Sequence, residues 1–363
     1  MMILSADPVT FHSWWRRSKY PPYGLRKVEA ISKGKIVPPE RLWKERIDVL
    51  GIYVNDPLGK SEIGTAISRI LKRDPPYVAS FKKFRQSVIK MKEERGFRVI
   101  VGGPGAWQLT EEGWIDSLLI GEAEESFNET LLKNGVVQGR KAEHFVPILG
   151  PSSMAEVEIS RGERKVSEDV VLAEMEVQGR AHGKVNLITQ DIASYGSEEE
   201  VEEVLLTASK YGKVTFSNVN AITALQFNWS KVKEGLHLSR QNFLTPVLNS
   251  IAGSCVYSLD AEVVKVLNKS FIYPVIYVPE EVTHEFLNYD DIVIPLPQTE
   301  RYYEVLYAAW IHDKKYVKFP FSYVMDYVLR KAVETKGEHL RRLNKMGALR
   351  DFLLASIFKM LSP

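Results

Sequence analysis

Short apolar segments alternate with amphipathic helical segments along the chain, and this alternation constrains the fold more than any other feature. Residues 47–54 form a mostly apolar run, which is typical of a buried parallel strand. Further strands are expected at residues 99–101 and 117–120. Between them, apolar residues recur at helical spacing in two stripes: Ile63, Ile67, Ile70 and Leu71, then Phe81, Phe84, Val88 and Met91. The alternation predicts a doubly wound α/β domain.

The length of 363 residues predicts two domains, because single cores seldom grow so large. Residues 147–153 are rich in Pro, Gly and Ser and indicate a boundary. Strand–helix alternation resumes after them and predicts a partial or full barrel. The expected organisation is an irregular basic and aromatic arm (1–40), a Rossmann-like domain (41–146), a barrel-like domain (147–320) and a C-terminal helical extension (321–363).

The chain contains one cysteine, Cys255. An internal disulfide, a multi-cysteine zinc site and a three-cysteine iron–sulfur site are therefore excluded for this chain alone. A small buried side chain is a better interpretation of Cys255 than a nucleophile. Residues 1–10 lack the apolar core of a signal peptide, and no 18-residue apolar run occurs, so we expect a cytoplasmic protein without a membrane segment.

Both ends of the chain are basic. Residues 11–35 hold seven Lys or Arg against one acid, and residues 314–359 hold eleven against four. Trp14, Trp15, Arg16 and Arg17 mix rings and cations, as single-strand nucleic-acid surfaces do, or belong to an arm packed across the domain junction. Helical spacing puts three C-terminal cations on one face, which is either a phosphate-facing surface or a solvated one: Arg341, Arg342 and Lys345. An RNA, a ribonucleoprotein or a protein is the expected partner.

Six short stretches carry a resemblance to a known family, at residues 22–30, 56–59, 101–109, 120–124, 157–162 and 189–196. In this order they resemble archaeal proteins in which a cobalamin-binding domain is fused to a radical SAM domain. The resemblance covers roughly residues 20–200. It implies a Rossmann-like cobalamin-binding domain followed by a radical SAM-like partial (β/α) barrel, resembling a TIM barrel.

The cluster loop that the resemblance implies is missing. In the family, the pair matching Arg161 and Gly162 is followed by three cysteines that hold a [4Fe–4S] cluster. Here residues 163–166 are Glu-Arg-Lys-Val, and Ser167 is expected to open a helix. We therefore expect no cluster and no radical SAM chemistry from this chain.

The cobalamin-binding residues that the resemblance implies are only partly present. Asp56 matches the first residue of the family's Asp-x-His-x-x-Gly motif, but Leu58 stands where the axial histidine would be. Gly102 and Gly103 match a glycine pair that lets the backbone approach the cofactor, or else form a turn that needs a positive φ.

In the second domain, the resemblance implies that Asp191 and Tyr195 line an adenosyl pocket. A turn capped by Asp191 is the alternative.

The leading hypothesis is a non-catalytic pseudoenzyme that binds or regulates a larger partner, such as a ribonucleoprotein or a paralogous subunit. No cofactor is expected, although cobalamin and SAM stay open as ligands. The alternatives are a cluster-free enzyme that uses SAM or cobalamin, for example in methyl transfer, and a small-molecule sensor.

Overall fold

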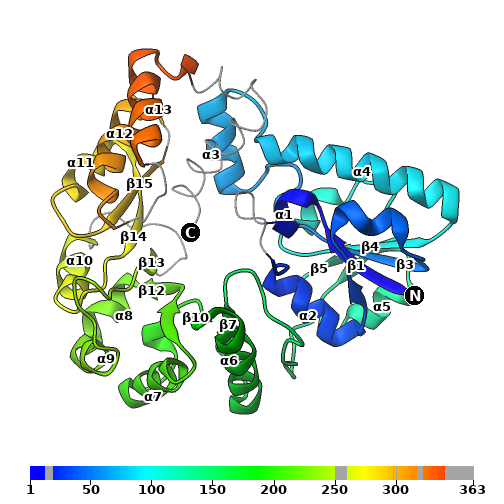
Figure 1. Ribbon diagram of the computed structural model, residues 1–363, viewed down its shortest axis with the longest axis horizontal. Coiled ribbons are helices and arrows are strands. Elements are labelled where there is room, and N and C mark those ends of the chain that lie inside the picture. The colour runs from blue at the N-terminus through cyan, green and yellow to red at the C-terminus, as the bar shows by residue number, and fades with distance from the viewer. Residues whose placement is uncertain (13–18, 250–259, 297, 300, 317–321, 340–363) are drawn as a thin grey trace. The chain divides into compact units, whose positions relative to one another are not determined.

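The computed structural model describes residues 1–12, 19–249, 260–296, 298–299, 301–316 and 322–339 (Figure 1). The chain divides into two units. Unit 1 comprises Met1–Met154 and Glu168–Val177, and unit 2 comprises Ala155–Ser167 and Gln178–Pro363. The Pro/Gly/Ser-rich residues 147–153 lie within unit 1.

Unit 1 is built on a six-stranded sheet in which every neighbouring pair is parallel. The strand order is β2-β1-β3-β4-β5-β6, so the chain crosses from one side of β1 to the other between β2 and β3. Sheets of this kind bind ligands at the carboxyl ends of strands beside such a reversal. The strands are β1 (Met2–Ala6), β2 (Lys35–Ile36), β3 (Val49–Tyr53), β4 (Arg98–Gly102), β5 (Ser117–Ile120) and β6 (Gly135–Gln138).

The prediction of an irregular arm over residues 1–40 is wrong for the part that the structure describes. Strand β1 lies between β2 and β3 inside the sheet, and Ile3 and Leu4 are fully buried. Five residues give too short an apolar pattern to identify a strand, and pairing with β3 supplies what the pattern lacks. Residues 23–32 of the expected arm form a helix, α2 (Tyr23–Ser32).

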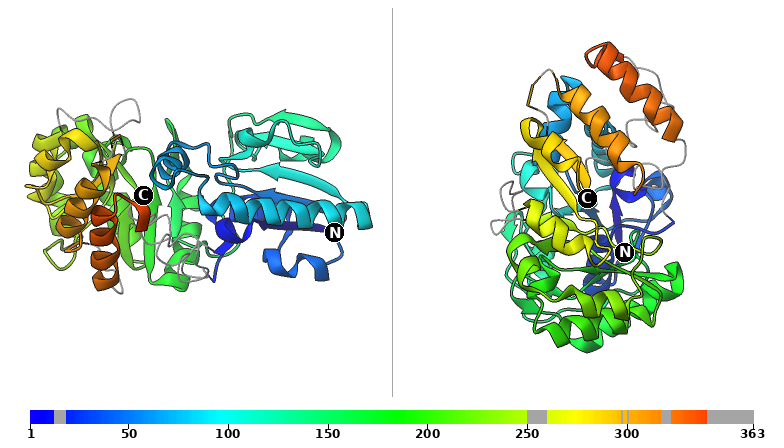
Figure 2. Two further views of the ribbon diagram at one scale, coloured as in Figure 1. Left: turned by 90° about the horizontal axis from the view of Figure 1, so that it is seen from above. Right: turned by 90° about the vertical axis from the view of Figure 1, so that its left-hand side faces the viewer.

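Helices bury their apolar residues on both faces of this sheet. Consecutive strand residues point to opposite faces, so Ile3 joins the core with Phe81 and Val88 of α4, whereas Leu4 packs with Leu25 of α2. Helix α4 runs along the sheet in the left view of Figure 2. The helices are α1 (Pro8–His12), α2, α3 (Glu62–Leu71), α4 (Pro76–Arg95), α5 (Phe127–Leu132) and the first part of α6 (Glu168–His182).

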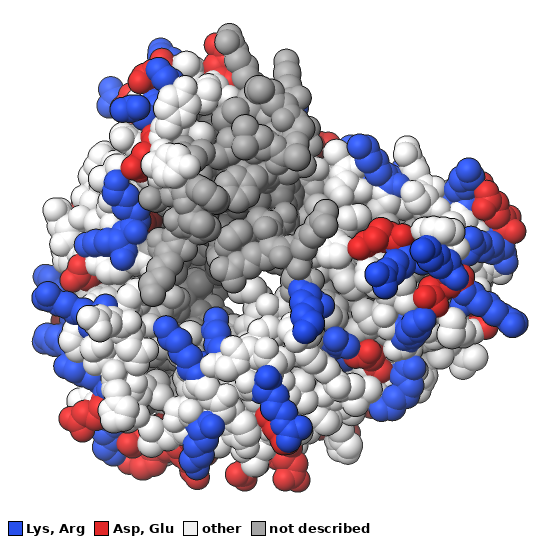
Figure 3. Space-filling model, viewed as in Figure 1, with Lys and Arg blue, Asp and Glu red and all other residues white. Residues whose placement is uncertain are grey.

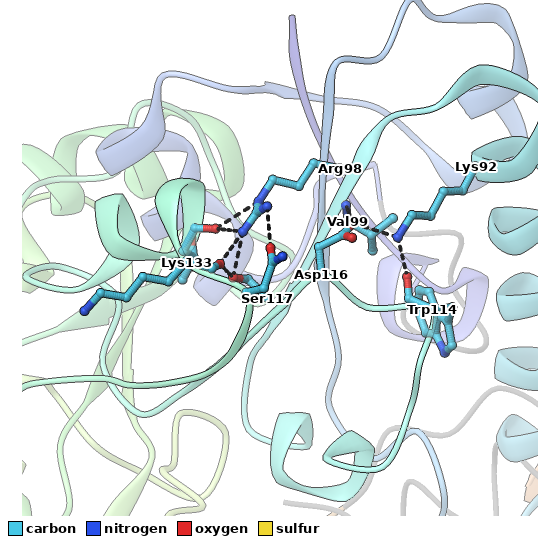
Figure 4. Close-up of polar contacts among 9 residues, drawn as sticks. Lys92, Arg98, Val99, Trp114, Asp116, Ser117 and Lys133 are labelled. Atoms are coloured by element: carbon cyan, nitrogen blue, oxygen red, sulfur yellow. Dashed lines mark hydrogen bonds and ion pairs between the residues drawn. The ribbon is translucent and has the colours of Figure 1, made fainter.

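A polar cluster closes the amino edge of this sheet (Figure 4). The Arg98 guanidinium donates to the carbonyl oxygens of Thr130 and Lys133 in the last turn of α5 and to the Ser117 hydroxyl. The Asp116 carboxylate accepts from Lys92 Nζ and from Val99 N, both at 2.7 Å. The last carbonyl groups of a helix have no partner within the helix, and a cation placed there stabilises them. Arg98 therefore stabilises the C-terminal end of α5.

Unit 2 contains two parallel sheets, in the orders β11-β10-β7 and β12-β13-β14-β15. Ser217 alone separates β11 from β12, so the two sheets follow one another along the chain as a partial (β/α) barrel. A two-stranded antiparallel hairpin, β8–β9, follows β7. The strands are β7 (Glu156–Glu158), β8 (Ser160–Arg161), β9 (Arg164–Lys165), β10 (Lys184–Ile188), β11 (Lys213–Phe216), β12 (Asn218–Asn220), β13 (Val247–Asn249), β14 (Val275–Pro279) and β15 (Ile292–Leu296).

The predicted fold class is confirmed, because both units are α/β structures with parallel sheets. The strand predicted at residues 117–120 appears as β5. Unit 2 contains helix α7 (Glu198–Ser209). Later in unit 2 the chain forms α12 (Tyr302–Asp313) and α13 (Ser322–Glu334), and residues 340–363 of the expected C-terminal extension lie outside the described residues. The helices of the described part are all too short or too polar to cross a membrane.

Candidate functional site

Asp56 lies just beyond the carboxyl end of β3 and joins three segments of unit 1. Its carboxylate accepts hydrogen bonds from Ser61 N at 3.1 Å, Ser61 Oγ at 2.7 Å, Tyr77 Oη at 2.5 Å and Gln108 Nε2 at 2.6 Å. Ser61 is the N-cap of α3, and Tyr77 belongs to α4. Asp56 therefore fixes the starts of two helices against the end of β3.

The electrostatics of Asp56 agree with a carboxylate that is satisfied from within the protein. Burial acts to raise its pKa, but the hydrogen bonds from Tyr77, Ser61 and Gln108 outweigh burial and hold the pKa below its usual value. The same contact and burial raise the pKa of the Tyr77 hydroxyl. Sequence reasoning identified Asp56 but missed Tyr77 and Gln108, which come from segments 21 and 52 residues away.

The positions around Asp56 do not fit a histidine-ligated cobalamin. Leu58, at the position of the axial histidine, packs against the apolar core, and its N–H donates to Gln108 Oε1 at 2.9 Å. No nitrogen ligand is supplied there. Binding of cobalamin with its own base as the lower ligand makes no demand on this position.

Of the two glycines at the end of β4, only Gly103 occupies a position where a side chain would not fit. Gly103 has a φ of +109°, and a Cβ there would lie 2.4 Å from the Val54 carbonyl oxygen. At Gly102 a Cβ would meet Leu119 at 3.7 Å, an ordinary contact. Gly103 is thus required by its own backbone geometry and by the packing of β4 on β3, without any ligand. The structure brings Gly103 and Asp56 together at the carboxyl edge of these adjacent strands.

In unit 2, a tight hairpin occupies the position of the cysteine loop that the family resemblance implies. Arg161 of β8 pairs with Arg164 of β9, which leaves only Gly162 and Glu163 as the turn. Gly162 has a φ of +62°, the left-handed conformation that glycine adopts readily. The neighbouring backbone is paired too, since Val166 N donates to Ile159 O at 2.9 Å. The donor set and the loop length both fail to fit a three-cysteine cluster.

Polar side chains at the carboxyl edge of unit 2 bond to one another. Arg161 forms two bonds of 2.7 Å with the carboxylate of Glu158, the last residue of β7. The hydroxyl groups of Ser160 and Thr189 lie 2.7 Å apart, and Asn218 Nδ2 donates to the Thr189 carbonyl at 2.9 Å. At the ends of β7 and β10, where barrel folds place their chemistry, these polar side chains are engaged in hydrogen bonds within the protein.

Asp191 caps the turn after β10. Its carboxylate accepts from Ala193 N at 3.1 Å, from Asn220 N at 2.9 Å, from the Ser194 hydroxyl, and from Thr223 Oγ1 at 2.8 Å. It therefore holds the end of β10 against β12 and α8 (Ala221–Gln226). These are the contacts of a residue that caps a turn, which is the alternative interpretation of Asp191.

Tyr195 lies four residues after Asp191, and its ring packs under Lys165 of the hairpin, with Nζ 4.8 Å from the ring centroid. Lys165 also forms a 2.6 Å ion pair with Glu200. The hairpin β8–β9 and the start of α7 are thereby tied together.

The predicted partner-binding residues lie outside the described residues: Trp14, Trp15, Arg16, Arg17, Arg341, Arg342 and Lys345. Cys255 lies outside them as well. On the face drawn in Figure 3, Lys and Arg side chains of the described residues are interspersed with Asp and Glu. No group of three or more His, Cys, Asp or Glu in the described part of the chain is arranged to hold a metal ion.

A buried ion pair was missed by sequence reasoning. Lys27 Nζ lies 2.6 Å from Glu174 Oε1 and donates to the Val146 carbonyl at 2.9 Å. Glu174 also accepts from Tyr23 Oη at 2.6 Å and from Ile148 N at 3.2 Å. We call these residues the linker clamp, since Tyr23, Lys27 and Glu174 together hold residues 146–148. Residues 22–30, the first stretch of the family resemblance, thus supply two residues that hold residues 146–148 in place within unit 1.

No protein family and no curated protein matched this sequence. In fold, the chain is similar to the radical S-adenosylmethionine methyltransferase TsrM from Kitasatospora setae, solved with tryptophan substrate and the SAM analog aza-SAM bound. That alignment has a TM-score of 0.53 and 10% identity and covers 79% of this chain and 70% of TsrM. A TsrM structure with cobalamin and a [4Fe–4S] cluster bound aligns over 79% of this chain and 72% of its own, with a TM-score of 0.49 and 10% identity.

The first alignment confirms the fold that the six stretches predict, a cobalamin-binding-type domain followed by a radical SAM-type domain. At 10% identity the likeness concerns the fold alone. The roles of Asp56, Gly102, Gly103, Asp191 and Tyr195 toward a cofactor stay predictions.

Proposed function

We propose that this chain is a non-catalytic binding or regulatory protein, a pseudoenzyme derived from a cobalamin-dependent radical SAM enzyme, which docks on a larger partner. The observation that carries the proposal is the hairpin β8–β9 in a chain with one cysteine. A fold of this class without cluster ligands lacks the electron donor for reductive cleavage of SAM. The retained two-domain scaffold is then available for binding.

The hydrogen bonds at both carboxyl edges support this proposal. Asp56 and Asp191 each accept four hydrogen bonds from the protein, and Arg161 is paired with Glu158. A general acid or base needs a side chain within reach of a substrate proton and free to exchange it. These acidic groups instead hold loops and helix starts in place.

The first test is anaerobic reconstitution with iron and sulfide. We expect no stoichiometric cluster and no absorbance shoulder near roughly 400 nm, where thiolate-bound clusters absorb. A Cys255→Ser variant is the matched control, because iron bound adventitiously will persist in it. About four irons per chain, lost in the Cys255→Ser variant, would show that a cluster forms and would overturn the proposal.

The second test asks whether the partner contains nucleic acid. Docking through the two basic ends predicts RNA binding that weakens steeply with salt, since each neutralised phosphate releases counterions. Replacing Arg341, Arg342 and Lys345 with Gln should flatten the salt slope by up to about three units. Replacing Trp14 and Trp15 should lower the affinity at an unchanged slope, because stacking carries no charge.

The matched control replaces three exposed, ion-paired lysines of unit 1 with Gln: Lys82, Lys90 and Lys133. This variant should leave the slope unchanged. Undetectable binding to total cellular RNA at low salt would reject nucleic acid, and co-purification from the native cell would then identify a protein partner. Saturable binding of cobalamin or SAM with turnover of a methyl acceptor would replace the proposal with a cluster-free enzyme.

A further inference from the structure

Strand β6 forms one edge of the sheet in unit 1, and its outer side is open. Gly135 N and Gly139 N donate to carbonyl oxygens on the β5 side, at 2.8 Å and 2.7 Å. Backbone groups of successive strand residues point alternately to the two sides, so those of Val136 and Gln138 point away from β5. No described residue forms a hydrogen bond with these outward groups. The edge therefore offers unpaired N–H and C=O groups to another extended chain.

The opposite edge of the same sheet is protected against such pairing. Strand β2 is only two residues long, and Pro38 and Pro39 follow it closely. Its Lys35 side chain is ion-paired with Glu45 at 2.8 Å. Short length, lysine and proline are common means by which proteins keep an edge strand from pairing with another chain. Strand β6 is as long as β5 and has no lysine or proline between residues 135 and 138.

Exposed apolar side chains lie on this edge and beside it in the chain. Val136 of β6 is 47% exposed. Leu132, which ends α5 and is separated from β6 by two residues, is 86% exposed, more than any other large apolar side chain in the described part of the chain. A partner that covers this edge would remove apolar surface from water, which favours association.

The charges beside β6 do not oppose contact with a second copy of the chain. Lys133 and Arg140 flank the strand, and both are ion-paired with Glu129, at 2.8 Å and 2.9 Å. Residues 135–138 themselves are uncharged. Within the paired strands, two copies of this edge therefore place no like charges opposite each other.

We propose that two copies of the chain associate edge to edge through β6, with the strands antiparallel about a two-fold axis at Val137. In this register Val136 of one copy lies opposite Gln138 of the other. Both residues have outward backbone groups, so each of these pairs can exchange both of its N–H···O bonds. A two-fold axis brings identical surfaces together, and this strand is complementary to itself in that register.

The proposed interface is small. Two strands of four residues each are too few to bury the roughly 1,200–2,000 Å² of a standard interface, so we expect a weak, reversible dimer. The proposal is separate from docking on a larger partner, because it uses neither basic end of the chain. Either proposal can therefore fail without the other.

The test is sedimentation velocity of the full chain over a wide concentration range, under reducing conditions so that Cys255 cannot link two chains. We expect a reversible equilibrium between monomer and dimer. Val136→Lys should raise the dissociation constant at least tenfold, because it adds a charge at the pairing edge. Gln138→Pro should have an effect of the same size, because it removes an N–H that points away from β5 and leaves the bonds within the sheet in place.

The matched control is Leu149→Lys, at a leucine of unit 1 that is 57% exposed and lies outside β6. Its dissociation constant should stay within twofold of that of the unmodified chain, and circular dichroism should show all variants folded. Equal weakening by Val136→Lys and Leu149→Lys would overturn the proposal. A chain that stays monomeric would overturn it as well, and would leave the edge to an extended segment of another protein.

Amide hydrogen exchange of the unmodified chain gives the answer even if the variants misfold. Exchange at the Val136 and Gln138 amides should slow as the concentration rises, because only the dimer bonds them. The Val137 and Gly139 amides face β5 and should be protected at every concentration. Fast exchange at Val136 and Gln138 under conditions where the dimer forms would contradict pairing through β6.

Discussion

Glu174 in unit 1 and Asp291 in unit 2 are both completely buried carboxyl groups, but their surroundings are opposite. Glu174 faces the Lys27 ammonium and accepts hydrogen bonds from Tyr23 and Ile148. Neither oxygen of Asp291 has a hydrogen-bond partner in the described part of the chain. Its nearest basic group is His312, whose Nε2 lies 3.8 Å from Asp291 Oδ1.

The two carboxyl groups are stabilised in different ways. His312 is engaged elsewhere, with Asp313 at 2.8 Å on Nδ1 and the Tyr289 carbonyl at 2.8 Å on Nε2. Burial raises the pKa of Asp291 to about 8, the Asp313 charge adds to the rise, and His312 opposes it. Burial also raises the pKa of Glu174, but Lys27 and Tyr23 act against burial there. Unit 1 thus surrounds its buried carboxyl group with a cation and hydrogen-bond donors, whereas in unit 2 the raised pKa of the buried carboxyl group favours its protonated form.

The largest expected effect comes from breaking the pair in unit 1. Lys27→Met leaves Glu174 buried without a cation, and we expect a loss of about 3–5 kcal/mol in the free energy of unfolding. Chemical denaturation measures it. The control is the double variant Lys27→Met/Glu174→Leu, which should recover most of the loss because no buried charge remains. Equal destabilisation of the single and double variants would contradict a role for the charge pair.

The next effect concerns the pH dependence of unit 2. Between about pH 4 and pH 8, folded Asp291 keeps a proton that the unfolded chain has released, so this group makes stability fall as pH rises. The slope is at most about 1.4 kcal/mol per pH unit. Asp291→Asn removes this contribution, and its advantage over the unmodified chain should grow by about 2 kcal/mol from pH 6 to pH 8.

The measurement is the difference in unfolding free energy between Asp291→Asn and the unmodified chain at each pH. A difference is needed because other groups with raised pKa values also make stability fall as pH rises, among them Asp7, Glu174, His312 and Asp313. His312, Asp313 and Lys315 are the charged groups that act on Asp291. Parallel stability profiles for Asp291→Asn and the unmodified chain would show that Asp291 is ionised at neutral pH.

The smallest effect compares two tyrosine hydroxyls. Tyr23→Phe removes a donor to Glu174 and should cost about 1.5 kcal/mol, as expected for a hydrogen bond to a charged group. Tyr302→Phe, in unit 2, removes a buried hydroxyl without a partner among the described residues and should be neutral or stabilising. Thermal denaturation of both variants gives the comparison. A Tyr302→Phe variant as unstable as Tyr23→Phe would show that Tyr302 has a bonding partner.

Much of the fold could be predicted from the sequence, because a parallel strand that is covered on both faces has an almost continuous apolar sequence, which is easy to identify. Residues 99–101 and 117–120 were predicted as strands and appear in β4 and β5. Strand β1 was missed, since five residues carry too little periodicity. In the candidate sites, Asp56 and Asp191 were identified by resemblance, but their hydrogen-bond donors were not.

The sequence by itself determined that this chain, with one cysteine, cannot supply three thiolate ligands, since that follows from residue identity alone. Only the tertiary structure decided that residues 160–165 close into a hairpin and that Lys27 meets Glu174, 147 residues away. It also decided that Asp291 is buried without a hydrogen-bond partner in the described part of the chain. Burial and long-range pairing depend on which segments pack together, and local patterns of polarity do not carry that information.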